Sequence, residues 1–182
     1  MTRAERSSSR RAELLAVGVR LFSQRGLESV TTEDLRRECG VSVGLLYHYF
    51  GDKRGFWLAA LAACADELLD AIVFDPAEPA AAIARFLDHA DARPGLFRSV
   101  LRGGGGDAEA YAVVQHTRSE IARRVLLGLG RPLGGAPSDR LAVVAWLGAV
   151  EAATFHWLDT GEVSRAEVAA LALSTLPTFA AE

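Results

Sequence analysis

The chain has 182 residues, half of them hydrophobic, and its formal net charge is -3 at pH 7. This length allows one good core, or a small domain attached to a larger one. The longest apolar runs fall short of the roughly 20 residues that a membrane helix requires, and the basic, serine-rich start lacks the apolar segment of a signal peptide. We therefore expect a cytoplasmic protein without a membrane span.

The charges are distributed unevenly along the chain. Residues 1–56 hold ten Lys/Arg and seven acidic residues, a net of +3, so residues 57–182 carry -6. A basic segment attracts the phosphates of nucleic acid, whereas an acidic segment does not. The pattern favours a DNA-binding N-terminal part, and a solvated charged face is the alternative interpretation.

Helical periodicity recurs from end to end, and no segment shows the convincing alternation of a β-strand. The start of the chain, residues 1–11, holds four arginines among serines, and we expect residues 1–10 to be a disordered arm, either a solvated leader or a minor-groove contact. The sequence predicts an all-α fold with helices over residues 9–25, 32–39, 43–50, 52–73, 80–92, 94–102, 107–127, 138–160 and 164–180.

The second and third of these helices carry strong local signals. Asp34 follows Thr31 by three residues, as in a capping box, Gly40 can adopt the left-handed backbone that ends a helix, and Ser42 can cap the next helix. Two helices joined by a short turn with glycine form a helix-turn-helix, whose second helix enters the major groove of DNA.

The run from Thr31 to Lys53, with TT, GVS, LYHYF and then K after two residues, resembles the TetR-like family of bacterial transcriptional regulators. The recognisable motif covers residues 11–61, and the remainder agrees in length, helical pattern and the run PGLFRSVLR at 94–102. The resemblance implies a three-helix DNA-binding head, residues 1–56, on a helical ligand-binding and dimerisation body, residues 57–182. It implies DNA contacts from Thr32, Tyr47, His48 and Lys53, with Ser42, Val43, Gly44 and Leu45 at the tip of the recognition helix.

Three residues depart from the family's pattern. Val43 and Leu45 stand where a polar or basic residue and a threonine are usual, so we expect poorer hydrogen-bond readout, with thymine methyl groups as the remaining target. Arg36 stands where alanine is usual. It either points outward as an extra phosphate contact or changes the packing of the first two helices.

The helix predicted at 138–160 is apolar nearly all round. Leu141, Val144 and Gly148 lie on one face with Ala152 and Phe155, while Val143 lies on another with Trp146. One face can pack in the core of its own domain, and the other can contact a second copy of the chain in a two-fold four-helix interface. A larger core in a monomeric protein is the alternative. The residues expected at this homodimer interface are Trp146, Val150, Trp157, Leu171, Leu176 and Phe179.

The body also holds aromatic and polar side chains that suit a pocket for an apolar small molecule, although aromatic residues at helical spacing more often fill a core. Glu151 lies on an apolar stripe, where an unpaired carboxylate is costly to bury. It pairs with an arginine such as Arg98 or Arg118, reaches solvent, or binds a cationic or hydroxylated ligand. The candidate pocket residues are Trp57, Phe86, His89, Phe97, Tyr111, Gln115, Trp146, Glu151, Phe155 and His156.

No catalytic or metal-binding pattern occurs in the sequence. The four histidines are scattered, and Cys39 and Cys64 fit small buried thiols in a reducing compartment. The four glycines at 103–106 follow no strand and precede no Lys-Ser/Thr, so we expect a flexible hinge and no phosphate cradle. The sequence thus predicts a cofactor-free repressor, released from a palindromic double-stranded DNA operator by a small-molecule effector, and not an enzyme. The alternative is a helical dimeric ligand-binding protein with a degenerate DNA-binding head.

Overall fold

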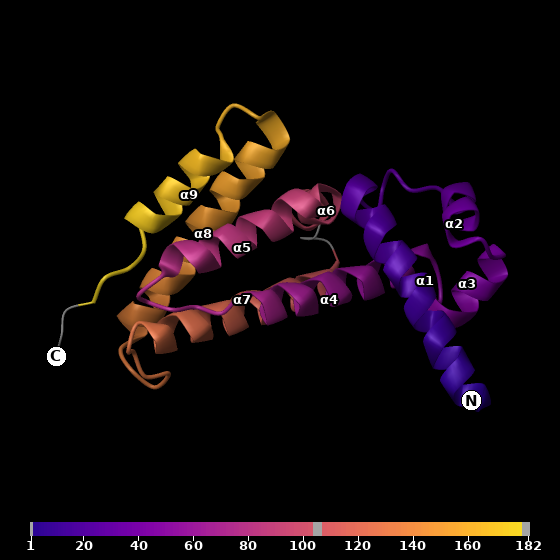
Figure 1. Ribbon diagram of the computed structural model, residues 1–182, viewed down its shortest axis with the longest axis horizontal. Helices are drawn as coiled ribbons and strands as arrows, with labels where there is room; N and C mark the ends of the chain where they lie inside the picture. The colour runs from indigo at the N-terminus through magenta and orange to yellow at the C-terminus, as the bar shows by residue number, and fades with distance from the viewer. Residues whose placement is uncertain (1, 104–106, 180–182) are drawn as a thin grey trace. The chain divides into compact units, whose positions relative to one another are not determined.

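The computed structural model describes residues 2–103 and 107–179, and all regular elements within these ranges are helices (Figure 1). This confirms the all-α prediction. The hinge predicted at 103–106 lies, except for its first residue, outside the described residues. The helices are α1 (Arg3–Arg25), α2 (Thr32–Cys39), α3 (Val43–Phe50), α4 (Lys53–Ala71), α5 (Pro79–Ala92), α6 (Pro94–Gly103), α7 (Ala108–Gly128), α8 (Pro137–Thr160) and α9 (Arg165–Ser174).

Contacts divide the chain into two compact units. Unit 1 comprises Met1–Ala65 and Arg93–Val113, and unit 2 comprises Asp66–Ala92 and Val114–Glu182. This division differs from the predicted boundary at residue 56 because α6 packs on α1. A Cβ atom added to Gly95 of α6 would lie 2.6 Å from the carbonyl oxygen of Phe22, so only glycine allows this approach.

The core of unit 1 is built by α1 to α4 and α6. Leu14 and Phe22 of α1 are buried with Leu35 of α2, Leu46 of α3 and Phe56 of α4. The rings of Phe22 and Phe56 meet edge to face with their centroids 5.6 Å apart. Each fully buried side chain of this kind contributes about 1.5–3 kcal/mol, so the short helices α2 and α3 gain most of their stability from this packing.

The first helix begins earlier than the sequence predicts. The Thr2 hydroxyl accepts a hydrogen bond from the Glu5 N–H, and the Glu5 carboxylate accepts one from the Thr2 N–H. This capping box satisfies N–H groups that would otherwise lack partners and starts α1 at Arg3. The prediction of a disordered arm over residues 1–10 is therefore wrong.

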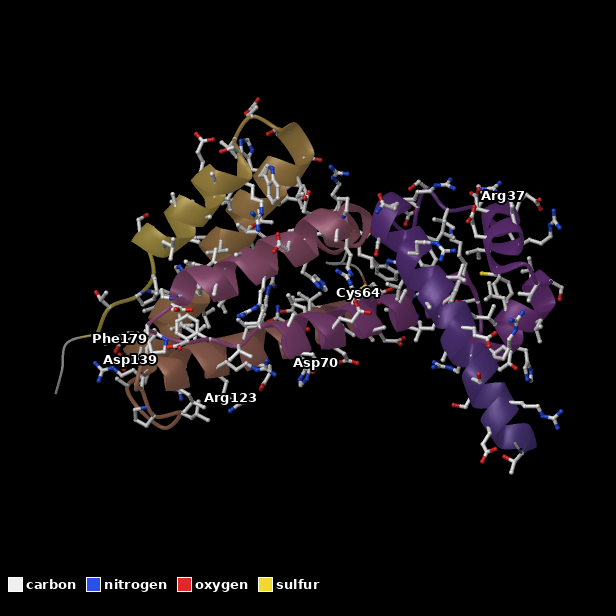
Figure 2. The ribbon with its side chains drawn as sticks, in the orientation of Figure 1. Arg37, Cys64, Asp70, Arg123, Asp139 and Phe179 are labelled. Carbon is white, nitrogen blue, oxygen red and sulfur yellow. The ribbon has the colours of Figure 1, made fainter. Side chains whose placement is uncertain are left out.

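Unit 2 is a helical assembly in which α9 packs on both α5 and α8 (Figure 1). Val143, Trp146 and Val150 of α8 are buried in its core. The indole N–H of Trp146 donates to the carbonyl of Ala172 at 2.9 Å, which ties α8 to α9. Beyond the end of α9, the ring of Phe179 lies under the guanidinium of Arg131, and Figure 2 shows Phe179 beside Asp139.

The last helix ends at Ser174 and not near residue 180 as predicted. The N–H and the hydroxyl of Thr175 both donate to the Leu171 carbonyl, at 3.0 and 2.7 Å. Pro177 follows shortly afterwards and cannot donate a backbone hydrogen bond, so the helical bonding does not continue through it.

Helix α8 is long and apolar enough to cross a membrane by length and composition, contrary to the expectation from the sequence, and 22% of its most apolar window is buried. Such a helix on its own is weak evidence for insertion, because core helices can have the same composition. Its apolarity has two sources in this fold. One face fills the core of unit 2, and a second face, described below, is exposed.

Candidate nucleic-acid interface and ligand cavity

The helix-turn-helix of unit 1 is fixed by the caps that the sequence predicts. The Thr31 hydroxyl accepts from the Asp34 N–H at 3.1 Å, and the Asp34 carboxylate accepts from the Thr31 N–H at 2.9 Å. Gly40 has φ 62° and ψ 23°, the left-handed backbone that ends α2. The Ser42 hydroxyl then accepts from the Leu45 N–H at 3.3 Å. Both helices accordingly have the predicted bounds.

The outward face of α3 is small and largely apolar at its tip. Gly44, Leu45 and His48 are exposed, whereas Val43 and Tyr47 are half-buried. No heavy atom lies within 4 Å of a Cβ built on Gly44, so the backbone itself is open to a partner. A surface of this kind can approach base edges closely and contact thymine methyl groups, but it offers few hydrogen-bond donors.

Asp34 is the centre of a polar network between α1 and α2. Its carboxylate accepts from the Thr31 hydroxyl at 2.7 Å and pairs with Arg25 at 3.0 Å and Arg37 at 2.7 Å. These bonds, that of Arg25 first and those of Thr31 next, hold the pKa of Asp34 far below its usual range. Figure 2 shows Arg37 at the edge of α2. The network keeps Asp34 ionised and fixes the end of α1 against the start of α2.

The two interpretations of Arg36 are separated by its position. The side chain is exposed and forms two hydrogen bonds with Glu33, at 2.6 and 2.9 Å, so it points outward and does not alter the packing of α1 on α2. Thr32 is exposed on the same helix. An exposed ion pair contributes little to stability, so Arg36 can exchange Glu33 for a phosphate at low cost.

Lys53 has a structural role that the sequence does not reveal. Its ammonium donates to the carbonyl of Leu27 at 3.1 Å and to that of Val30 at 2.8 Å. These bonds attach the start of α4 to the loop between α1 and α2. An ammonium has three N–H donors, so one is left for the predicted phosphate contact.

The neighbouring Arg54 joins the start of α4 to the start of α7 within unit 1. Its guanidinium binds both carboxylate oxygens of Asp107, at 2.6 and 2.7 Å, and also Glu109 at 3.1 Å. Asp107 further accepts from the N–H of Ala110 at 3.0 Å and so caps α7. Arg54 first, and this cap second, lower the pKa of Asp107 to about 2. No local spacing signals this contact, because the partners are far apart in the sequence.

A cavity lies within unit 2, between α5, α7 and α8. It has an empty volume of about 520 Å³, part of which is open to solvent. Its walls are mostly aliphatic and aromatic, and its charged lining residues are Arg118 and Glu151. The lining consists of Ile72, Phe74, Ala82, Ile83, Phe86, Arg118, Ile121, Val125, Trp146, Leu147, Val150 and Glu151.

Glu151 is paired with Arg118, one of the two arginines expected from the sequence. The guanidinium Nε lies 2.9 Å from each carboxylate oxygen, and Nη2 lies 2.5 Å from Oε2. The Arg118 side chain is 33% exposed and that of Glu151 is 19% exposed, so the pair is partly withdrawn from water.

The structure brings together only part of the predicted pocket. Phe86, Trp146 and Glu151 line the cavity, whereas His89, Gln115, Phe155 and His156 belong to unit 2 but lie outside its lining. Trp57, Phe97 and Tyr111 belong to unit 1, where Trp57 is buried in the core and Tyr111 is exposed. These three are not among the residues that line the cavity of unit 2. Helical periodicity shows that a side chain lies on the apolar face of its helix, but it does not show which of two cores that face contacts.

Most of the residues predicted for the dimer interface pack within unit 2. Trp146 and Val150 are buried in its core, because the Val143 face of α8 is turned inward, and Trp157, Leu176 and Phe179 pack against that core. Leu171 is 44% exposed, as an interface residue should be before association. The opposite face of α8 is the open one, with Leu141 70% and Val144 57% exposed beside the exposed Ala145, Gly148, Ala149 and Ala152.

Within the described residues, no group of three or more His, Cys, Asp or Glu is placed to hold a metal ion. Both cysteines are buried and unbridged. Burial raises the pKa of the Cys39 thiol, which makes a reactive thiolate unfavourable there.

Known families match both parts of the chain. Residues 14–60 match the family described as bacterial regulatory proteins, tetR family, and residues 76–177 match the tetracyclin repressor-like C-terminal domain. The HTH-type transcriptional repressor KstR2 of Rhodococcus jostii is 38% identical over 61 residues, which are 34% of this chain and 30% of that protein. The HTH-type transcriptional regulator BetI of Brucella canis is 39% identical over 61 residues, 34% of this chain and 31% of that protein. The matched segment thus spans about a third of the length of these relatives.

Solved structures extend the similarity to most of the chain. A tetR-family transcriptional regulator from Streptomyces coelicolor has a TM-score of 0.83 and 28% identity, covering 92% of this chain and 79% of that one. A TetR-like transcriptional regulator from Rhodococcus sp. RHA1 has a TM-score of 0.65 and 22% identity, covering 92% and 93%, and at that identity the likeness shows the fold alone.

Proposed function

Because this chain belongs to the TetR family of bacterial regulatory proteins, we propose that it is a repressor that binds a palindromic operator as a homodimer and releases it when a small apolar effector occupies unit 2. The observation that carries this proposal is the capped α2–α3 pair, which presents Gly44, Leu45 and His48 outward while Leu46 and Phe50 anchor α3 in the core. A recognition helix needs this combination of a fixed inner face and an open outer face.

The open face of α8 supports the homodimer. Leu141 and Val144 are the most exposed large hydrophobic side chains of this helix, and Gly148 and Ala152 continue the face with small residues. Small residues let two helices approach closely, and exposed apolar side chains gain free energy when a partner covers them. A two-fold pair would carry two α3 helices, which calls for an inverted repeat with half-sites separated by whole helical turns.

Release by an effector requires that the ligand bind one conformation of the body better than another. A ligand that binds both conformations equally leaves the DNA affinity unchanged. The cavity of unit 2 supports this part of the proposal, because α7, which lines it with Ile121 and Val125, begins in unit 1, and the lining residue Ile72 directly follows α4, which also begins in unit 1.

The decisive experiment selects genomic fragments bound by the purified protein at about 150 mM salt with excess competitor DNA, where non-specific binding is weak. A palindromic sequence should be enriched. Leu45→Gln should change which bases are preferred, whereas Arg36→Gln should weaken binding to all sequences alike. Arg123→Gln, which breaks an exposed ion pair of unit 2, is the matched control. No enrichment by folded, dimeric protein would favour the degenerate-head alternative.

The dimer face is tested by a charge on α8. Leu141→Glu should give a monomer in analytical ultracentrifugation and remove high-affinity operator binding, because a charge cannot be buried in an apolar interface. Val73→Glu is the matched control, since Val73 is 67% exposed and Leu141 is 70% exposed, but Val73 lies outside α8. A dimeric Leu141→Glu protein would refute this interface.

A further inference from the structure

The Arg118–Glu151 pair determines what kind of molecule the cavity of unit 2 can accept. We propose that the cavity binds a neutral, mainly apolar molecule whose hydroxyl group donates a hydrogen bond to Glu151, and that it rejects carboxylates and ammonium ions of the same shape. This inference rests on the proposed function, since it names the chemical class of the effector, but the binding itself can be measured without DNA.

The walls of the cavity provide little polar recognition of their own. Most lining side chains are aliphatic or aromatic, and the indole N–H of Trp146 is already bonded to the Ala172 carbonyl. An apolar skeleton therefore fits against Ile83, Phe86 and Leu147, where it gains about 25 cal/mol for each Å² withdrawn from water. Orientation of the ligand is left to Arg118 and Glu151.

The two charged residues that line the cavity, Arg118 and Glu151, have a net charge of zero. The guanidinium of Arg118 and the carboxylate of Glu151 are bonded at 2.5 to 2.9 Å, and both are partly withdrawn from water. A ligand carboxylate would have to take Arg118 from Glu151, and a ligand ammonium would have to take Glu151 from Arg118. Either exchange breaks a partly buried ion pair that is held by several hydrogen bonds, which is costly. Charged ligands are therefore disfavoured.

A hydroxyl group avoids this exchange because Glu151 can accept a further hydrogen bond. A carboxylate has about four acceptor sites. The carboxylate of Glu151 accepts two N–H groups of Arg118. The Nε–H is shared between both carboxylate oxygens, and an Nη2–H is donated to Oε2. A ligand O–H can donate to an oxygen of Glu151 while the ion pair stays intact. A hydrogen bond to a charged acceptor is among the stronger kinds, so the hydroxyl should improve affinity about tenfold over a methyl group.

Isothermal titration calorimetry with matched probes tests the proposal on the full-length protein. The probes are benzene, naphthalene and phenanthrene skeletons that each carry hydroxymethyl, methyl, carboxylate or aminomethyl. On at least one skeleton, the hydroxymethyl compound should bind about tenfold more tightly than the carboxylate and the ammonium compounds. Equal or tighter binding of a charged probe, or no binding by any skeleton, would overturn the proposal.

Two variants should reverse the preference in opposite directions. Glu151→Gln removes the carboxylate that binds Arg118 in the cavity lining, so the carboxylate probe should become the tightest ligand. Arg118→Gln leaves Glu151 without its cation, so the ammonium probe should become the tightest. Asp88→Asn, which breaks the exposed 2.5 Å pair with Arg165 outside the cavity lining, should keep the wild-type ranking. An unchanged ranking in folded Glu151→Gln protein would contradict the assignment, and should that variant not fold, the wild-type ranking and Arg118→Gln decide.

The failure of this inference can be told apart from failure of the proposed function. Operator binding without any probe binding would refute the cavity assignment and leave the repressor proposal standing. Probe binding in the predicted order, with no sequence-specific DNA binding, would refute the repressor proposal and support the cavity assignment. The hydroxymethyl probe that binds best should also lower operator affinity, and the Asp88→Asn protein should respond in the same way.

Discussion

The two units use their buried and half-buried polar groups for different purposes. In unit 1, Asp34 and Asp107 accept hydrogen bonds from backbone N–H groups at the starts of α2 and α7, and Lys53 donates to the backbone carbonyls of the loop between α1 and α2. In unit 2, Arg118 and Glu151 bond to each other at the edge of a cavity. The polar groups of unit 1 fix one arrangement of its helices, as the proposed reading of DNA requires, whereas unit 2 keeps a cavity, as the proposed binding of an effector requires.

The largest effect is expected where unit 1 is packed most closely. A Cβ atom at Gly95 would lie 2.7 Å from the backbone nitrogen of Arg25 and 2.6 Å from the carbonyl oxygen of Phe22. Gly95→Ala should therefore lower the free energy of unfolding by about 3 kcal/mol, since backbone atoms must move to make room. Urea denaturation measures this loss. An unchanged midpoint would show that α6 is not held on α1 as the structure places it.

A smaller loss is expected in the core of unit 2. Trp146→Phe removes the indole N–H and leaves the Ala172 carbonyl without this donor, which should cost about 2 kcal/mol in thermal or urea unfolding. The same change alters the cavity wall and should shift the affinity of the neutral probes. Stability close to that of the wild type would mean that water replaces the lost donor, and thus that this part of the core is open.

The contrast between the units also explains what the sequence could predict. The bounds of α2 and α3 follow from Thr31, Gly40 and Ser42, because caps and left-handed glycines act over three or four residues. The exposed position of Leu45 agrees with the tip of the recognition helix that the family resemblance implies. Such short-range signals determine most of the candidate DNA interface.

The remaining features depend on contacts between distant segments. Periodicity identifies α8 as apolar on two faces but cannot say that the Trp146 face turns inward and the Leu141 face outward. Nor can it show that Lys53 bonds to the carbonyls of Leu27 and Val30, or that Trp57 and Trp146 enter different cores. The disordered arm was a compositional inference, and the capping box of Thr2 outweighs it in the structure.

Lys53 separates a structural role from a DNA-binding role. Lys53→Ala leaves two carbonyls without their donor and should lower the free energy of unfolding by about 1.5 kcal/mol. If its third N–H also binds phosphate, the slope of log affinity against log salt should fall by about one unit. Lower stability with an unchanged slope would assign Lys53 to the fold alone. Arg123→Ala should change neither quantity appreciably.

Acid should act on unit 1 through Asp107. Because the folded-state pKa is lowered from 3.8 to about 2, this carboxylate stabilises the fold above pH 4, and the contribution is lost as the pH falls from about 4 to 2. Asp107→Asn and Arg54→Gln should each flatten the stability profile in this window, with Glu109→Gln having a weaker effect. Unfolding curves from pH 5 to 2 measure the slope. Equal slopes in Asp107→Asn and wild-type protein would exclude the pairing.

The smallest change in stability is expected for a substitution at Gly44. This substitution should raise the stability of the protein but weaken its binding to the operator. No atom lies within 4 Å of an added Cβ, and alanine is the better helix former, so Gly44→Ala should stabilise the protein by about 0.5 kcal/mol. The same methyl group projects from the outward face of α3 and should keep the backbone away from the bases, which weakens operator binding. Stabilisation with unchanged operator affinity would show that the tip of α3 does not approach DNA closely, and recognition would then fall to Leu45 and His48.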